Sequence, residues 1–282
     1  MLLMWARGVV FAYLNNFSYC CSSWWGLHWG ALLRREKRSR LYLNYFEETP
    51  LWTIIKMELL KKMEDVEYNP EVKRIQQGSD KKKLYVFNKV AAQQDLFGPL
   101  REHQPILKMR IYNMLTAGMK KKLSRYTPSY IGVHIRRGDF KLSDQTTPDN
   151  YFIRGIQLIR NIAGEQIPVT VYTDAYADEM QELLSMPHVE LASKKPDILD
   201  LLLLSQSKIM MLSRSSTFSY WAAFLSDAVV VRPSNDWQPL IKINAEKNGY
   251  HEIQWDYESD VSTDNFKRVI KEKYLLQAEN VN

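Results

Sequence analysis

The stretch that decides the fold is YIGVHIRRGDF, which occupies residues 130–140. Residues 130–135 carry three β-branched side chains and little polar character, which is typical of a strand buried on both faces. A charged run with one glycine follows at once, so the chain leaves the core at a polar turn. In sheets with helices on both faces, ligands bind outside the carboxyl ends of the strands. The end of this strand is therefore the first place to expect a functional site.

Strands and helices alternate downstream of this stretch. Short apolar runs predict strands over residues 130–135, 169–173, 189–192, 209–212 and 228–232. The last of these is expected to be the final strand, before a polar tail with one helix over 264–277. Helical spacing predicts the intervening helices over residues 149–162, 177–184, 196–205 and 217–225. This alternation predicts an α/β fold with a parallel sheet.

The first 125 residues have a different pattern. Helices are predicted over 1–15, 52–63 and 105–123, and strands over 17–21 and 84–87. The pattern changes near Tyr126-Thr127-Pro128, so we expect a boundary there between two α/β halves.

Composition narrows the class of protein. A hydrophobic content of 45% in 282 residues excludes a wholly disordered chain. The two cysteines, Cys20 and Cys21, are adjacent and cannot join distant segments, which favours a reducing compartment. No apolar run reaches the roughly 20 residues that a membrane-spanning helix needs. The net charge of +6 is compatible with nucleic acid, an anionic membrane or a phosphorylated small molecule.

Two arginines follow the strand over 130–135. Because side chains alternate along a strand, His134 and Arg136 should point to one side and Arg137 to the other. The guanidinium fork of arginine matches phosphate oxygens, and Gly138 permits a tight turn. Asp139 is placed to hold an arginine or to accept a proton. The alternative for this cluster is a surface salt bridge at a strand end.

A turn rich in hydroxyl groups follows the strand over 209–212. Ser215, Ser216 and Thr217 precede an apolar helix, whose first N–H groups form a natural anion site. Simple capping of the helix explains only one hydroxyl. Asp174, after the strand over 169–173, is interpreted as the cap of the next helix, with contact to a ligand as the alternative. Asp200 is a lone acid among leucines, either solvated or within reach of a base edge such as that of guanine.

At these residues the sequence resembles a known family. Residues 134–139 match the H-x-R-R-x-D motif of GDP-fucose-dependent fucosyltransferases, and the wider run is similar to the α1,2-fucosyltransferases of glycosyltransferase family 11. Residues 200–206 and 217–223 resemble that family's late motif, and Thr173-Asp174 resembles its middle motif. The resemblance is specific over about residues 126–235.

The resemblance implies an inverting GT-B-like enzyme with two Rossmann-like halves and parallel sheets. Residues 1–125 would form an N-terminal acceptor half, 126–245 the half that binds the GDP-sugar, and 246–282 a tail with a helix. Family members usually begin with a strand and a glycine-rich turn, which do not precede Met1 here. The resemblance therefore implies a truncated N-terminal half.

The same resemblance assigns roles to the residues that match the motifs. Arg136 would engage the β-phosphate of the donor, Arg137 would support it or hold Asp139, and Asp200 would meet the guanine edge. The expected catalytic residues are Arg136, Arg137 and Asp139. The expected donor-binding residues are His134, Arg136, Arg137, Asp200, Ser215, Ser216, Thr217 and Phe218. We expect no metal, because the sequence has no Asp-x-Asp and its five histidines lack ligand spacing.

The expected reaction is transfer of L-fucose from GDP-β-L-fucose to a glycan, α1,2 on a terminal galactoside. The expected acceptor is an oligosaccharide or lipid-linked saccharide of a bacterial surface polysaccharide. A cytoplasmic enzyme that associates peripherally with the anionic inner face of the membrane would suit this acceptor. The alternatives are a transferase for another GDP-sugar, a GDP-binding pseudoenzyme, and a nucleic-acid-binding module that uses the basic runs 34–40, 81–83 and 120–122. We expect no nucleic-acid partner, because those runs are far apart and offset by 32 acidic residues.

Overall fold

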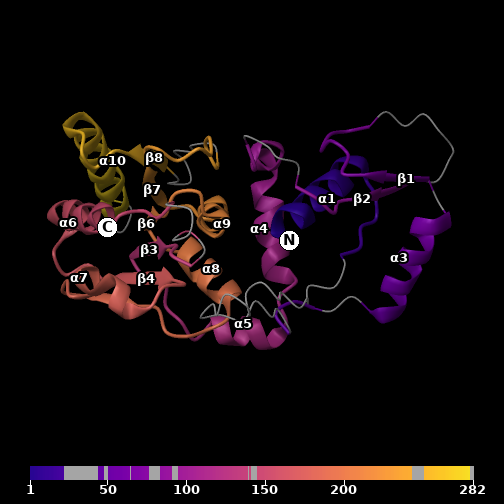
Figure 1. Cartoon of the computed structure of the whole chain (residues 1–282), viewed down its shortest axis with the longest axis horizontal. Coiled ribbons are helices and arrows are strands. Elements are labelled where there is room, and N and C mark those ends of the chain that lie inside the picture. Colours follow the sequence, from indigo (N-terminus) through magenta and orange to yellow (C-terminus); the bar gives the residue numbers. More distant parts are fainter. Residues whose placement is uncertain are drawn as a thin grey trace. The chain divides into compact units, whose positions relative to one another are not determined.

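A computed structural model describes most of the chain. It covers residues 1–21, 44–47, 50–63, 65–75, 83–90, 95–138, 140, 145–242 and 251–279. The described residues divide in sequence into two compact units, one that ends at Lys122 and one that begins at Leu123 (Figure 1). The basic run 34–40 lies outside the described residues, as do Lys81 and Lys82 of the run 81–83.

The second unit is built on a six-stranded parallel sheet. Its spatial order is β5-β4-β3-β6-β7-β8, so the first strand, β3, lies in the middle, β4 and β5 are added on one side of it, and β6, β7 and β8 on the other. This is the strand order of a Rossmann fold, in which ligands bind at the topological switch point, where the strand order reverses. The switch point here lies between β3 and β6. The strands are β3 (Ile131–Ile135), β4 (Val169–Thr173), β5 (Val189–Leu191), β6 (Ile209–Leu212), β7 (Val229–Pro233) and β8 (His251–Trp255).

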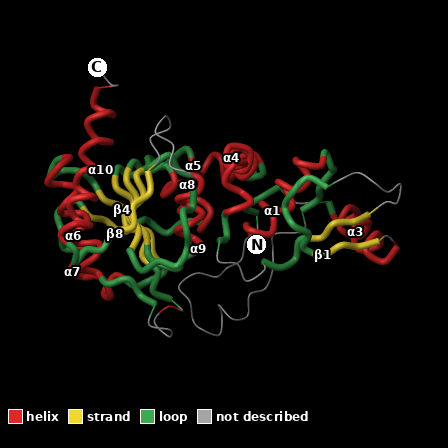
Figure 2. The backbone as a smooth tube through the Cα atoms, turned by 90° about the horizontal axis from the view of Figure 1, so that it is seen from above, coloured by secondary structure: helices red, strands yellow, loops and turns green. Residues whose placement is uncertain are grey.

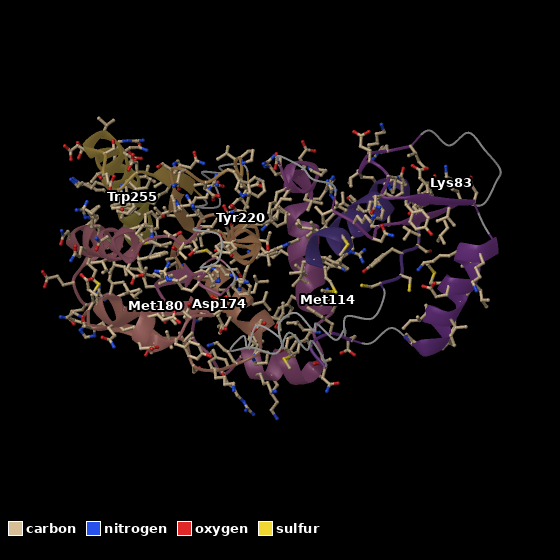
Figure 3. All side chains as sticks on the ribbon, in the orientation of Figure 1. Lys83, Met114, Asp174, Met180, Tyr220 and Trp255 are labelled. Carbon is tan, nitrogen blue, oxygen red and sulfur yellow. The ribbon has the colours of Figure 1, made fainter. Side chains whose placement is uncertain are left out.

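Helices cover both faces of this sheet (Figure 2). One face packs against α6 (Asp149–Ala163), η3 (Ala177–Met180), α7 (Gln181–Leu184) and α10 (Asp260–Glu279). The other face packs against α8 (Asp197–Ser205) and α9 (Thr217–Leu225). Alternate strand residues such as Val133, Val171 and Met211 build the core under the first group of helices. Trp255 belongs to that core, with its ring centroid 4.8 Å from that of Phe266 (Figure 3).

Close packing of α8 on the sheet explains one glycine of the deciding stretch. A Cβ atom at Gly132 would lie 2.4 Å from Ser207 Oγ and 2.7 Å from Leu204 Cδ1. We expect Gly132→Ala to lower the free energy of unfolding by about 1–3 kcal/mol, because the surrounding core must shift to make room. Urea unfolding measures this loss. Gly118→Ala serves as the control, because that glycine is exposed in a helix and its Cβ would meet nothing closer than 3.9 Å.

The first unit contains a smaller sheet. Its elements are α1 (Leu2–Asn15), α3 (Leu51–Met63), β1 (Asp65–Tyr68), β2 (Lys83–Val86), η1 (Gly98–His103), α4 (Gln104–Asn113) and α5 (Ala117–Leu123). β1 and β2 pair in parallel. The ring of Phe11 on α1 packs against Tyr85 of β2 at 4.8 Å between centroids. A cavity of about 500 Å³ lies among α1, α3 and β2, lined mostly by apolar side chains.

Several predicted elements differ from the structure. Residues 17–21 form no strand. The helix predicted over 105–123 is broken into α4 and α5, because Leu115 pairs with Phe46 and the Thr116 N–H donates to the Tyr45 carbonyl instead of continuing the helix. The strand over 228–232 is not the last, since β8 pairs with β7. β1 was not predicted, and α10 begins at Asp260 rather than at residue 264.

The predicted α/β class with parallel strands is confirmed, and both units contain a parallel sheet. The roles predicted for residues 1–125, 126–245 and 246–282 stay predictions. Within the described part of the chain, no helix is both long and apolar enough to cross a membrane. The basic run 120–122 lies on α5 and is partly or fully exposed.

Candidate active site

The carboxyl ends of β3 and β6 lie side by side at the topological switch point of the sheet. His134 on β3 is opposite Leu212 on β6. The His134 ring is buried, stacks on Phe218 of α9 at 4.8 Å between centroids, and has Nδ1 2.6 Å from Ser219 Oγ. The structure therefore brings the first motif and the last motif of the sequence into direct contact. In this position His134 joins β3 to the start of α9.

Arg136 is held from two sides. Its backbone N–H donates to Ser213 Oγ at 2.9 Å, and its guanidinium forms an ion pair with Asp174 at the end of β4. The guanidinium also lies over the ring of Phe140, 5.7 Å from its centroid. Arg136 is only half-buried, so its charge is accessible to a ligand at the carboxyl end of β3, and these contacts fix the direction of its guanidinium.

Asp174 holds the segment of residues 136–138 after β3, which we call the arginine loop. Besides pairing with Arg136, its carboxylate accepts hydrogen bonds from the N–H groups of Arg137 at 2.9 Å and Gly138 at 3.3 Å. A Cβ atom at Gly138 would lie 2.5 Å from Asp174 Oδ2, so any other residue here would push the Asp174 carboxylate from its position. The interpretation of Asp174 as a helix cap is wrong, because Tyr176 is the N-cap of the next helix.

Arg137 points to the opposite side of β3, as predicted from the alternation of side chains. It is buried, and its guanidinium donates to the Thr147 carbonyl at 2.6 Å and to the carboxylate of Asp149, the first residue of α6. Arg137 therefore ties the loop to α6. Asp139, its expected partner, lies outside the described residues.

The hydroxyl-rich turn prepares the N-terminus of α9. Ser216 is the buried N-cap, and its hydroxyl accepts a hydrogen bond from the Ser219 N–H at 3.5 Å. Ser215 is half-buried, with its backbone in the left-handed region at φ 57°. Thr217 is exposed as the first helical residue, followed by Phe218. The free end of the helix, with the Thr217 hydroxyl beside it, is suited to an anion.

Asp200 is buried rather than solvated. It is 1% exposed on α8, and Lys195 Nζ lies 3.1 Å from its Oδ1. The Lys195 ammonium also lies over the rings of Tyr126 and Tyr172, 5.0 and 5.6 Å from their centroids. Burial and the Asp200 charge raise the pKa of Tyr172, which stays protonated. A base edge would reach Asp200 only if Lys195 moved.

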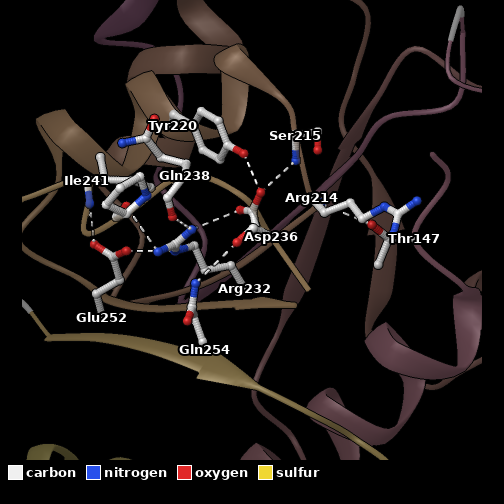
Figure 4. Close-up of polar contacts among 11 residues, drawn as sticks. Thr147, Arg214, Ser215, Tyr220, Arg232, Asp236, Gln238, Ile241, Glu252 and Gln254 are labelled. Carbon is white, nitrogen blue, oxygen red and sulfur yellow. Dashed lines mark hydrogen bonds and ion pairs between the residues drawn. The ribbon is translucent and has the colours of Figure 1, made fainter. Parts of the chain in front are cut away.

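Sequence reasoning missed the residues that hold the site from other segments. Asp174, Asp149 and Ser213 hold the arginine loop, and Lys195 neutralises Asp200. Arg214 was not singled out within the hydroxyl turn, although its N–H donates to Thr147 Oγ1 at 3.1 Å (Figure 4). Its Nε donates to the Gln145 carbonyl. The signals for Asp174 were its position directly after a ligand-side strand and the resemblance of Thr173-Asp174 to the family's middle motif.

A family model described as Glycosyl transferase family 11 matches residues 94–259, which is more than half of the chain. The chain belongs to glycosyl transferase family 11. The match includes all three motifs on which the resemblance rested, so the resemblance to family 11 is confirmed.

Among solved structures, this family 11 member is similar to two of NodZ alpha-1,6-fucosyltransferase. One was soaked with GDP-fucose and has 16% identity, a TM-score of 0.39, and coverage of 64% of this chain and 61% of that chain. The other was co-crystallised with GDP and has 16% identity, a TM-score of 0.41, and coverage of 67% and 63%. The chain thus covers less than two thirds of their length. No curated protein matches the chain.

Proposed function

We propose that this family 11 glycosyltransferase transfers L-fucose from GDP-β-L-fucose to a glycan, with an α1,2 linkage to a terminal galactoside. The observation that carries the proposal is the hydrogen bond from the Arg136 N–H to Ser213 Oγ, which joins the segment after β3 to the turn that leads from β6 into α9. This site presents a fixed guanidinium and a helix N-terminus on the side where nucleotides bind.

The proposed donor contacts follow from what each side chain can offer. Arg136 supplies a forked cation for the β-phosphate, and the start of α9 at Thr217 supplies N–H and hydroxyl donors. Ser215 and Ser216 shape this turn, and the buried His134 supports it by stacking on the half-buried Phe218. Asp200 is the proposed partner of guanine, and Lys195 would have to yield its place to the base.

In the proposed mechanism, the costly event is the departure of GDP. Negative charge grows on the β-phosphate while the sugar gains oxocarbenium character. Arg136 and the helix N-terminus stabilise that charge because they are oriented before the reaction, so little reorganisation is needed. Arg137 acts indirectly by fixing the loop on α6. Asp139, directly after Gly138, is the proposed base for the acceptor hydroxyl.

The decisive experiment is a donor panel with product analysis. Incubation with several GDP-sugars and a β-galactoside acceptor should yield product only from GDP-fucose, and NMR of the product should show a 1,2 linkage. A product with a 1,6 linkage would refute the proposed specificity, and preference for another GDP-sugar would refute the donor. Binding of GDP-fucose by calorimetry without any transfer would identify a pseudoenzyme.

We expect activity to be independent of divalent metal. The proposed charge stabilisation comes from Arg136 and the N-terminus of α9, and neither contribution requires an ion. Treatment with EDTA should leave the rate of fucose transfer within about twofold of the untreated enzyme. Recovery of a lost rate on adding Mg²⁺ or Mn²⁺ would contradict this expectation.

A further inference from the structure

A buried cluster of charges, formed by Arg232, Asp236 and Glu252, lies next to Ser215 of the hydroxyl turn (Figure 4). Arg232 on β7 is 1% exposed, with Nη1 3.0 Å from Asp236 Oδ2 and Nε 2.6 Å from Glu252 Oε1 of β8. The same guanidinium donates to the carbonyls of Gln238 and Pro239. Burial opposes the charge of Arg232, but Glu252 and Asp236 outweigh it and raise its pKa. Two carboxylates are thus held in place by one cation.

The second oxygen of Asp236 reaches out of this cluster to the candidate site. Asp236 Oδ1 accepts a hydrogen bond from the Ser215 N–H at 3.0 Å and another from the Tyr220 hydroxyl at 2.5 Å. Burial and the charge of Asp236 raise the pKa of Tyr220, which keeps its hydroxyl protonated as a donor. A single carboxylate therefore fastens the turn before α9 and the first turn of α9 to each other.

This fastening acts at a conformation that serine seldom adopts. Ser215 has φ 57°, and non-glycine residues remain in the left-handed region only where their surroundings hold them. The hydrogen bond from the Ser215 N–H to Asp236 is the contact that holds it. Release of this bond would let the turn relax and would change the direction of the N–H groups at the start of α9.

We propose that Asp236 is a positioning residue for the diphosphate of the donor, acting through Ser215 and the N-terminus of α9. The inference rests on the proposed function, because it assumes that the diphosphate binds at this turn. Asp236 does not itself contact the donor. Arg232 holds the other oxygen of the Asp236 carboxylate and so fixes the direction of Oδ1 toward the turn.

Two isosteric variants separate this role from a merely structural one. Asp236→Asn replaces one carboxylate oxygen with an NH₂ group, removes the negative charge and disturbs the contacts to Ser215 and Tyr220. Glu252→Gln makes the same chemical change on the other side of Arg232, where the second carboxylate oxygen accepts a hydrogen bond from the Ile241 N–H. Affinity for GDP and for guanosine is measured by calorimetry on the full chain, together with the thermal midpoint.

Both variants are expected to lower the thermal midpoint. Only Asp236→Asn should weaken GDP binding, by about tenfold, while its affinity for guanosine stays unchanged because guanosine has no phosphate. Equal loss of GDP and guanosine affinity in Asp236→Asn, or a GDP affinity equal to that of Glu252→Gln, would overturn the inference. If the unaltered protein does not bind GDP, the proposed function fails first and the inference with it.

A milder variant, Tyr220→Phe, tests the same role if Asp236→Asn fails to fold. Tyr220→Phe removes one of the two hydrogen bonds to Asp236 Oδ1 and keeps the ring in place. Its affinity for GDP should fall about threefold, while its affinity for guanosine should not change. An unchanged GDP affinity in a folded Tyr220→Phe variant would count against the positioning role.

Discussion

Arg136→Ala is expected to abolish detectable transfer of fucose, a fall in turnover of at least about 10³-fold. Arg136 is the half-buried cation whose backbone is fixed by Ser213 and whose guanidinium is directed by Asp174. In the proposed mechanism the Arg136 guanidinium faces the leaving phosphate, and water is a poorer substitute there because it must reorganise as the charge develops. The measurement is single-turnover transfer from GDP-fucose with saturating acceptor.

The variant should remain folded. Without the Arg136 side chain, the Asp174 carboxylate still accepts from the N–H groups of Arg137 and Gly138, so the loop keeps its anchor. Arg154→Ala is the matched control, because Arg154 is an exposed arginine of α6 that contacts the Tyr257 carbonyl. It should transfer fucose at the normal rate. Near-normal turnover in Arg136→Ala would refute the assignment of Arg136.

Arg232→Met should have the largest effect on stability, a loss of about 3–5 kcal/mol in the free energy of unfolding. Removal of the guanidinium leaves two carboxylates, those of Asp236 and Glu252, buried without their cation. A charge without a partner in the interior is far more costly than a charge in water. Methionine is long enough to fill much of the space, so the loss reports mainly on charge.

Urea unfolding followed by circular dichroism measures this loss. Arg268→Met provides the comparison, because the Arg268–Glu272 ion pair on α10 is more than half exposed on both sides. That variant should change the free energy of unfolding by less than about 0.5 kcal/mol. Similar effects in the two variants would show that the buried cluster contributes no more than a surface pair.

The sheet of the second unit was predictable from the sequence because its strands are short apolar runs separated by amphipathic helices. The alternation also placed the loop after Ile135 and the turn after Leu212 at the same edge, as the structure confirms. β8 escaped prediction because three of its five residues, His251, Glu252 and Gln254, are polar. It is an edge strand, and one of these polar side chains serves the ion cluster rather than solvent.

The contacts that support the site depend on tertiary structure and leave no local pattern. Asp236 follows Ser215 by 21 positions and meets it only because β7 returns beside β6. Lys195 was a loop residue in the sequence, and its position against Asp200 is what makes a buried acid acceptable on α8. Residues 114–116 have no helix breaker of their own, and the break there comes from the contact of Leu115 with Phe46.

The position of β8 at the end of the sheet has a consequence for the handling of the protein. β8 and α10 cover one side of β7 and contribute Trp255, Phe266 and Ile270 to the core. A chain cut after residue 245 would expose the hydrogen-bonding edge of β7, a strand with three consecutive valines, and an exposed apolar edge of this kind favours aggregation. Shortened versions intended for crystallisation should therefore retain the chain through α10.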